Sequence, residues 1–174
     1  MTGNDAPGGE RQRLAELIAE HATTTHVSVA VAESLTGGLV SSALAAATDA
    51  GSWYRGCVVA YATQVKHDLL GVPEGPVVSA AAAAAMADGV RRLLDAEVAV
   101  AVTGAGGPSG QDGRPPGTVF IGVSHRGGTH AEHRFYPEDD PALVCELAAA
   151  DTLSLLRDAL GRHDAGLGVS GRPG

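Results

Sequence analysis

The hydrophobic positions of the chain repeat with two periods, and together they predict strands and helices in alternation. Valine alternates with smaller residues over 27–31 and over 98–102, a period of two that indicates buried strands. Further strands are predicted over 57–61, 118–124 and 130–135, the last two joined as a hairpin.

Helical periodicity and capping residues place helices between these strands. Apolar residues recur at helical spacing near the start of the chain, and an alanine-rich run follows Ser79, which fits an N-cap. Thr63 is expected to cap a shorter helix in the same way. The predicted helices are 10–24, 39–47, 63–70, 80–96 and 141–160.

This order of elements favours a single layered α/β/α domain with a mixed, mostly parallel sheet of about five strands. The chain has 174 residues, which is the length of one domain. We expect the domain to span residues 10–161. The polar, glycine-rich ends predict a disordered lead over 1–9 and a disordered tail over 162–174.

The composition of the chain limits the classes of partner that it is expected to bind. The formal net charge is -8 and there is no basic run, which argues against nucleic acid as a partner. No segment is long and apolar enough to span a membrane, and the first ten residues lack the features of a leader, so a cytoplasmic location is expected. Cys57 and Cys145 share no metal-ligand spacing, and Cys57 fits a small buried residue in an apolar run.

One basic residue stands apart from the others. Lys66 is the single lysine among twelve basic residues, and every other one is arginine. Arginine stays protonated in proteins, whereas a lysine can be tuned to act as a base. A position that remains lysine in an arginine-rich chain is therefore a candidate for proton transfer, although one lysine can also be left by chance.

The first candidate constellation is the turn from Glu33 to Gly38, between a predicted strand and a predicted helix. Active sites of open α/β sheets favour the ends of strands, and Ser34 in such a turn can project into the crevice. The N–H groups of the helix start suit an oxyanion or a phosphate. The alternative is that Ser34 or Thr36 only caps the helix.

The second constellation runs from Tyr61 to Lys66, at the end of a predicted strand. A lysine with its ordinary pKa of about 10.4 is neutral in only about one molecule in a few thousand at pH 7. Lys66 can therefore act as a base only in a mostly dry site. The alternative is a solvated surface lysine.

The third constellation is the glycine-rich loop over 102–110. It departs from a dinucleotide-binding fingerprint, because Ser109 stands at the third glycine position and no helix follows. It fits a substrate-binding loop or an ordinary surface loop. His130 and His133 of the hairpin point to opposite faces of a strand, so we expect no metal site there.

Three segments in order resemble the C-terminal domain of the CinA family, which includes stand-alone nicotinamide-nucleotide amidohydrolases. The resemblance covers roughly 27–160. The matching motifs are Ala32–Gly38, Tyr61 and Lys66 before Leu69–Val72, and Val102–Pro108 before Gly117–Val119.

The resemblance implies an amidohydrolase that converts nicotinamide mononucleotide to nicotinic acid mononucleotide and ammonia. Ser34 would be the nucleophile, Lys66 its general base, and Tyr61 would orient the pair. The chemistry needs no metal or organic cofactor. A homodimer is expected from the resemblance alone. The substrate-binding residues would be Glu33, Thr36, Gly37, Gly38, Thr103 and Gly104, with an oxyanion hole at the N–H groups of 36–38.

Two departures from the family pattern bear on the substrate. The family commonly has an asparagine where Thr63 stands, and often carries arginines in the region of 137–145, where this chain has acidic residues and Cys145. Two other readings therefore remain. One is a Ser–Lys hydrolase of another small amide or ester, and the other is a non-catalytic nucleotide-binding or interaction module of the competence-damage type.

Overall fold

The structure is a computed structural model that describes residues 7–167. The helices are α1 (Pro7–Thr25), α2 (Leu39–Ala45), α3 (Ala50–Trp53), α4 (Thr63–Leu70), α5 (Ala80–Leu93) and α6 (Pro141–Leu167). The strands are β1 (Val29–Glu33), β2 (Tyr54–Val59), β3 (Val98–Gly104), β4 (Thr118–His125) and β5 (Gly128–Phe135).

The five strands form one mixed sheet in the order β2-β1-β3-β4-β5. β1 pairs in parallel with β2 and β3, while β4 pairs antiparallel with both β3 and β5. Four of the five strands therefore run in the same direction, and the predicted mixed, mostly parallel sheet is confirmed.

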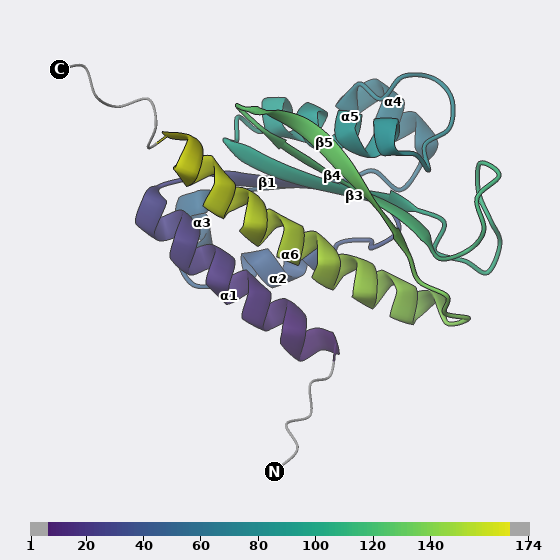
Figure 1. The fold of residues 1–174 in the computed structure, drawn as a ribbon, viewed down its shortest axis with the longest axis horizontal. Coiled ribbons are helices and arrows are strands. Elements are labelled where there is room, and N and C mark those ends of the chain that lie inside the picture. The colour runs from purple at the N-terminus through teal and green to yellow at the C-terminus, as the bar shows by residue number, and fades with distance from the viewer. Residues whose placement is uncertain (1–6, 168–174) are drawn as a thin grey trace, which may run out of the picture.

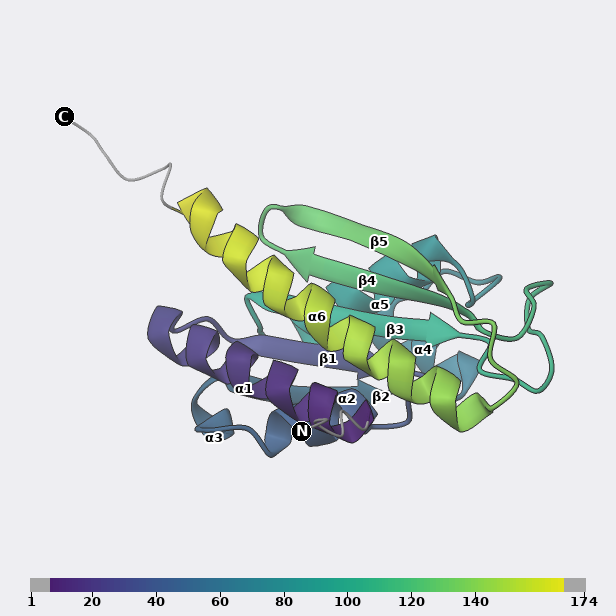
Figure 2. The ribbon, with the colours of Figure 1, turned by 60° about the horizontal axis from the view of Figure 1, so that its bottom comes forward.

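Helices cover both faces of this sheet (Figure 1). α1 and α6 lie side by side across one face, and α2 joins them beside β1 and β2 (Figure 2). α5 packs on the other face, chiefly against β3 and β4, and α4 packs against α5. The result is the predicted three-layer α/β/α arrangement.

The alternation of valine and alanine in β1 and β3 divides two cores between the faces. The valines point into the core formed with α1 and α6, and the alanines point into the core formed with α5. Small side chains let α5 approach the sheet closely. A Cβ added at Gly122 of β4 would overlap the backbone carbonyl of Ala83 in α5, so glycine is required at that contact.

Several boundaries differ from the predicted ones. α1 begins at Pro7 rather than at residue 10, and α6 extends to Leu167 rather than ending near 160. β2 occupies 54–59, earlier than predicted, because an edge strand that is half exposed lacks clear alternation. The short helix α3 was not predicted, since four residues carry no periodicity. The ends 1–6 and 168–174 lie outside the described residues, so their predicted disorder stays a prediction.

The two predicted caps have different outcomes. The Ser79 hydroxyl accepts a hydrogen bond from the N–H of Ala82 at 3.1 Å, so the N-cap of α5 is confirmed. The Thr63 prediction is wrong, because Ala62 holds the N-cap position of α4 and Thr63 is the first helical residue.

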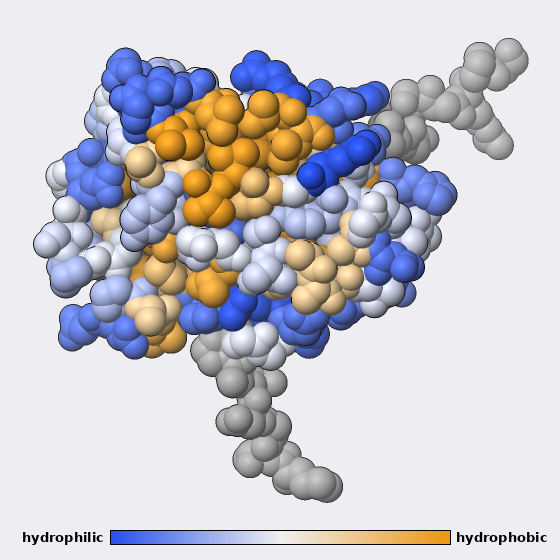
Figure 3. Space-filling view, turned by 180° about the vertical axis from the view of Figure 1, so that it is seen from behind, coloured by the Kyte–Doolittle hydropathy of each residue, from blue (hydrophilic) through white to orange (hydrophobic). Residues whose placement is uncertain are grey.

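The face turned away from α1 and α6 carries an apolar area (Figure 3). Exposed large apolar side chains on β2, α4 and α5 are those of Val59, Leu69 and Leu93. Within residues 7–167, no helix combines the length and apolar character needed to cross a bilayer.

Candidate functional site

Ser34 lies at the point where three parallel strands end together. In the strand register, Glu33 at the end of β1 is opposite Val59 of β2 and Val102 of β3. The N–H of Ser34 donates to the carbonyl of Val102 at 3.1 Å, and the N–H of Ala60 donates to the carbonyl of Glu33 at 2.7 Å. Ser34 is therefore held between the carboxyl ends of β2 and β3.

The strand order makes this position a topological switch point. The chain leaves β1 through α2 and α3 to reach β2 on one side, then crosses through α4 and α5 to reach β3 on the other side. These two connections cover opposite faces of the sheet, and ligands of such sheets bind beside a position of this kind. The sequence alone placed Ser34 at a strand end, and the strand order adds the topological switch point.

Glu33 holds the turn after β1 together. Its side chain is fully buried, and its carboxylate accepts four hydrogen bonds at the start of α2. The donors are the Thr36 hydroxyl at 2.6 Å and the N–H groups of Gly38, Val40 and Ser41 at 3.0, 3.2 and 2.7 Å. A carboxylate at this position satisfies the free N–H groups of the helix and its positive end. The Glu33 carboxylate is therefore engaged within the turn, and its predicted contact with substrate stays a prediction that these bonds do not support.

The other predicted substrate contacts of this turn also have structural roles. Thr36 is buried and uses its hydroxyl on Glu33. Gly37 and Gly38 have φ of 57° and 109°, a conformation that favours glycine and that the turn needs. The N–H of Gly37 donates to the Ser34 carbonyl, and that of Gly38 donates to Glu33, so neither is free for an oxyanion. The predicted oxyanion hole at 36–38 is therefore not supported at these two glycines.

Ser34 itself remains available for chemistry. Its side chain is only 7% exposed, and within residues 7–167 the structure records no hydrogen bond to its hydroxyl. The cap of α2 is supplied by the Glu33 carboxylate. The alternative in which Ser34 merely caps the helix is thereby excluded.

Lys66 is the most unusual side chain near this edge. It is 2% exposed and is among the largest fully buried side chains of the described part of the chain. Its Nζ donates to the backbone carbonyl of Tyr61, just beyond β2, at 3.3 Å. Burial lowers the pKa of Lys66, and the charge of Asp112 opposes this effect. The dry environment that a lysine base requires is present, and the alternative of a solvated surface lysine is excluded.

Ser34 and Lys66 are both placed at the carboxyl ends of β1 and β2 but are not hydrogen-bonded to each other. Among the described residues, the Tyr61 carbonyl is the acceptor recorded for the Lys66 Nζ. A catalytic hydrogen bond is often long in an unliganded site and tightens when substrate binds. The contact between the two side chains stays a prediction.

Tyr61, Thr103 and Gly104 do not have the predicted positions. The Tyr61 side chain is 72% exposed, and the hydrogen bond between this residue and Lys66 is accepted by its backbone carbonyl. Thr103 is buried and its hydroxyl donates to the carbonyl of Val77 at 2.8 Å. A Cβ at Gly104 would overlap the β4 backbone at Thr118, so this glycine serves the close approach of the two strands. The predicted orienting and pocket-lining roles of these side chains are therefore not supported.

Two residues near the site were missed in the sequence. Asp112 lies in the loop after β3, and its charge acts on Lys66 although nothing in the sequence links them. The Cys145 thiol, on α6, donates to the carbonyl of Leu35, the residue after Ser34, at 3.1 Å. Gly106 lies against both Leu35 and Cys145, so the loop after β3 closes over this turn.

Neither cysteine is an activated nucleophile. Burial and then the charge of Glu33 raise the pKa of Cys57 to about 12, and its half-buried thiol donates to Glu33 at 3.7 Å. Burial and then Glu146 raise the pKa of Cys145. Both thiols therefore stay protonated at neutral pH, and Ser34 is the nucleophile candidate.

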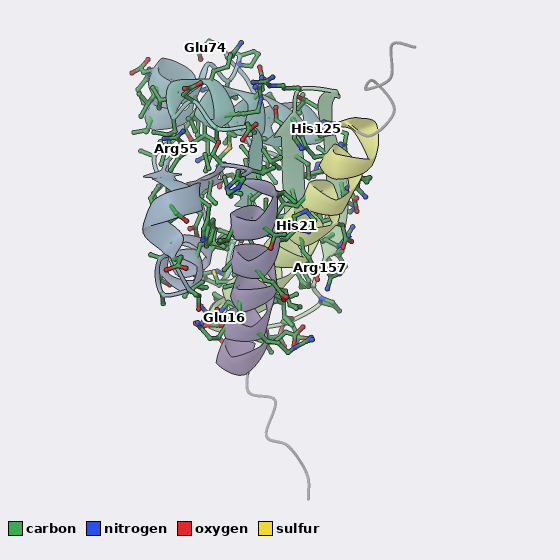
Figure 4. The ribbon with its side chains drawn as sticks, turned by 90° about the vertical axis from the view of Figure 1, so that its left-hand side faces the viewer. Glu16, His21, Arg55, Glu74, His125 and Arg157 are labelled. Carbon is green, nitrogen blue, oxygen red and sulfur yellow. The ribbon has the colours of Figure 1, made fainter. Side chains whose placement is uncertain are left out.

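A surface hollow of about 640 Å³ lies elsewhere, against the outer side of α1. It is lined by residues of α1, including Glu16, and by Thr48 and Asp49. Glu16 and Glu74, the latter just after α4, lie at opposite ends of the molecule (Figure 4). The hollow is therefore remote from α4, the helix that carries Lys66. No group of His, Cys, Asp and Glu within residues 7–167 is arranged to hold a metal ion.

Comparison with known proteins agrees with this architecture. The family model of the CinA C-terminal domain matches residues 11–160. A CinA-like protein of Synechococcus sp. (strain RCC307) is 40% identical over 163 residues, which cover 89% of this chain and 39% of that protein. A CinA-like protein of Frankia casuarinae is 38% identical over 158 residues, which cover 88% of this chain and 36% of that protein. The chain thus spans about two fifths of the length of these relatives.

Solved structures with this fold come from the same superfamily. A competence-damaged protein (CinA) superfamily protein of Klebsiella pneumoniae aligns with a TM-score of 0.82 at 28% identity, covering 87% of this chain and 98% of that one. The competence/damage inducible protein CihA of Agrobacterium tumefaciens aligns with a TM-score of 0.82 at 30% identity, covering 88% of this chain and 96% of that one. The chain belongs to the CinA C-terminal domain family.

Proposed function

We propose that this chain is a serine amidohydrolase that deamidates nicotinamide mononucleotide to nicotinic acid mononucleotide and ammonia. The observation that carries the proposal is the burial of Lys66 beside the strand ends that hold Ser34. A lysine is rarely buried without a charged partner at hydrogen-bond distance, and a lowered pKa is what a lysine base needs at neutral pH. A binding module would have no use for such a base.

The proposed reaction uses Ser34 and Lys66 as a nucleophile and its general base. Lys66 accepts the proton of the Ser34 hydroxyl as the oxygen attacks the amide carbon, which forms a tetrahedral intermediate. The C–N bond then breaks as the protonated Lys66 gives its proton to the leaving amide nitrogen, which departs as ammonia. Water hydrolyses the resulting ester on Ser34 in a second passage through the same groups.

An oxyanion in this intermediate needs N–H donors, and the turn offers two. The N–H groups of Gly37 and Gly38 are occupied, whereas those of Leu35 and Thr36 form no hydrogen bond with any described residue. These N–H groups follow Ser34 directly in the chain. We assign the oxyanion hole to Leu35 and Thr36 within this proposal.

The test is ammonia release from nicotinamide mononucleotide. We expect Ser34→Ala and Lys66→Met each to reduce kcat by at least about 10³-fold, since one removes the nucleophile and the other the base. Lys66→Arg should be equally inactive, because arginine keeps the charge but cannot accept the proton. Ser42→Ala is the matched control, since Ser42 is an exposed serine on α2 whose hydroxyl donates to the Leu39 carbonyl of the same helix.

The outcome decides between catalysis and binding. Full activity in Ser34→Ala would reject the nucleophile, and full activity in Lys66→Met would reject the base. Wild-type protein that binds the nucleotide without releasing ammonia would reject the amidohydrolase in favour of a nucleotide-binding module. Circular dichroism of each variant checks that the fold is intact.

A second candidate keeps the Ser34–Lys66 chemistry but changes the substrate to another small amide or ester. The observation that favours it is the neutral thiol of Cys145 beside the Ser34 turn, with three exposed acidic residues before α6 at 138–140. A phosphate would meet little positive charge there. A panel of carboxamides with and without a phosphate, measured by kcat/KM, separates the two candidates.

A further inference from the structure

The peptide between Leu35 and Thr36 lies at the centre of a tight turn that begins at Ser34. The N–H of Gly37 donates to the carbonyl of Ser34 at 3.1 Å, which closes a β-turn over 34–37. The central peptide of such a turn lies across it, so neither its C=O nor its N–H takes part in the closing bond. The direction of this peptide therefore depends on contacts from outside the turn.

The thiol of Cys145 on α6 provides a contact of this kind. Its Sγ donates to the Leu35 carbonyl at 3.1 Å. Burial, and then the charge of Glu146, raise the pKa of Cys145, so at neutral pH the thiol keeps the proton that it donates. The peptide is trans, and its C=O and N–H point in opposite directions. A bond that holds the Leu35 carbonyl therefore also sets the direction of the Thr36 N–H.

A salt bridge next to Cys145 fixes α6 against this region. The Nε of Arg11, on α1, lies 2.7 Å from the Glu146 carboxylate of α6. The same guanidinium donates through Nη1 to the carbonyl of Leu39, the first residue of α2, at 3.3 Å. Arg11 thus joins α1, α6 and the segment that directly follows the turn. The Cys145 thiol is held at the Leu35 carbonyl by more than its own hydrogen bond.

The same turn carries polar groups that have no partner. Ser34 is only 7% exposed, and none of residues 7–167 is recorded as a hydrogen-bond partner of its hydroxyl. The N–H groups of Leu35 and Thr36 also form no hydrogen bond with any described residue. Three consecutive residues therefore present one hydroxyl and two N–H groups. An attacked carbonyl group needs this set, a nucleophile for its carbon and donors for its oxygen.

We propose that Cys145 is a positioning residue that directs the Thr36 N–H towards the substrate oxygen. The inference rests on the proposed function for its catalytic meaning. As the Ser34 oxygen bonds to the amide carbon, the electron pair of the C=O bond moves onto the substrate oxygen, which accepts from the two N–H groups. The Leu35 N–H belongs to the peptide whose carbonyl closes the turn, whereas the Thr36 N–H belongs to the peptide that Cys145 holds. Separate contacts therefore fix the two donors.

The first test needs no substrate. Protein labelled with ¹³C and ¹⁵N gives separate signals for the Leu35 carbonyl carbon and the Thr36 amide, and both respond to hydrogen bonding of their peptide. We expect both signals to shift in Cys145→Ala, which removes the donor. They should return towards their wild-type positions in Cys145→Ser, which supplies a hydroxyl donor at the same place.

Ser154→Ala is the matched control for these signals. It removes a half-buried hydroxyl from the same helix, further along α6, where the recorded partner is Arg157. Both signals should stay unchanged in this variant. Unchanged signals in Cys145→Ala overturn the proposal, because the peptide would then be held without the thiol.

The second test is kinetic and uses nicotinamide mononucleotide. We expect Cys145→Ala to lower kcat by about 10-fold and to leave KM within about twofold, since the oxyanion exists only after attack. The loss of a whole oxyanion-hole donor costs about 10²–10³-fold in kcat, and here the donor remains but is less well directed. Across the wild type, Cys145→Ser and Cys145→Ala, kcat should follow the position of the Leu35 carbonyl signal.

The two tests separate this inference from the proposed function. A kcat that does not follow the Leu35 signal, or a raised KM with an unchanged kcat, overturns the positioning role. An inactive wild-type protein rejects the proposed substrate, while the carbonyl and amide signals still decide whether Cys145 holds the Leu35–Thr36 peptide. Circular dichroism confirms that each variant is folded, so that kcat values are compared for the native state.

Discussion

The role of Glu33 gives the sharpest test of this structure. Its carboxylate accepts four hydrogen bonds from the turn and one from the Cys57 thiol, and it has no contact with solvent, so Glu33→Gln keeps the shape and removes the charge. Glutamine has one oxygen to accept with, and its NH₂ group would face a donor. If the oxygen serves Thr36, Gly38 and Val40, the N–H of Ser41 loses its acceptor.

The magnitude follows from these losses. A buried donor left without its acceptor costs about 1–3 kcal/mol. Removal of a negative charge from the start of a helix costs about 0.3–1 kcal/mol, or up to about 2 when the site is partly buried. We therefore expect Glu33→Gln to lower the free energy of unfolding by about 3 kcal/mol. In a domain of this size that corresponds to a fall in Tm of about 6–12 °C.

Urea unfolding followed by circular dichroism measures this change. We expect a lower midpoint with an unchanged m-value, since the folded and unfolded surfaces are the same. Glu20→Gln is the control, because Glu20 is an exposed carboxylate on α1 and its replacement should change the free energy by less than about 0.5 kcal/mol. A loss below about 1 kcal/mol in Glu33→Gln, together with a raised KM, would refute the structural role and restore Glu33 as a substrate contact.

Three further predictions concern Lys66, Gly122 and Tyr61. Burial lowers the pKa of Lys66 below its ordinary 10.5, so the unfolded chain binds that proton more tightly and stability rises as the pH is raised from the folded pKa towards 10.5. Lys66→Met should abolish this slope and raise the free energy of unfolding at pH 7 by about 1–2 kcal/mol, measured by urea unfolding across pH. Gly122→Ala should lower it by about 2–3 kcal/mol through the overlap with α5, while Gly51→Ala, with no atom near the added carbon, should stay within about 0.5 kcal/mol. Tyr61→Phe should keep kcat within about twofold, because the Tyr61 backbone and not its hydroxyl contacts Lys66, and a loss of 100-fold would show that the hydroxyl acts in catalysis.

The sequence predicted the layers of this fold because its signals are local. The valine–alanine alternation of β1 and β3 gave the two buried faces, and the Ser79 cap gave the start of α5. The lone lysine identified Lys66 before any contact was known, since arginine elsewhere made the exception visible. The Ala32–Gly38 motif and its position at the end of a strand identified Ser34 in the same way.

Only the tertiary structure decided which polar residues are free to react. Glu33, Thr36 and Thr103 fit a substrate site by position, yet the side chain of each forms a hydrogen bond within the protein. Tyr61 fits a catalytic role by spacing, yet its side chain points to solvent. Asp112 and Cys145 reach the site from loops and helices that are distant in the chain.

The reason for this division is physical. Periodicity and capping are set by residues within a few positions of one another, so a single segment of sequence determines them. Burial, charge pairing and the crevice beside β1 depend on which strands become neighbours and which loops fold over them. The sequence thus determined the elements and the candidate nucleophile and base. Packing determined that Lys66 is buried and that the Glu33 carboxylate closes the turn after β1.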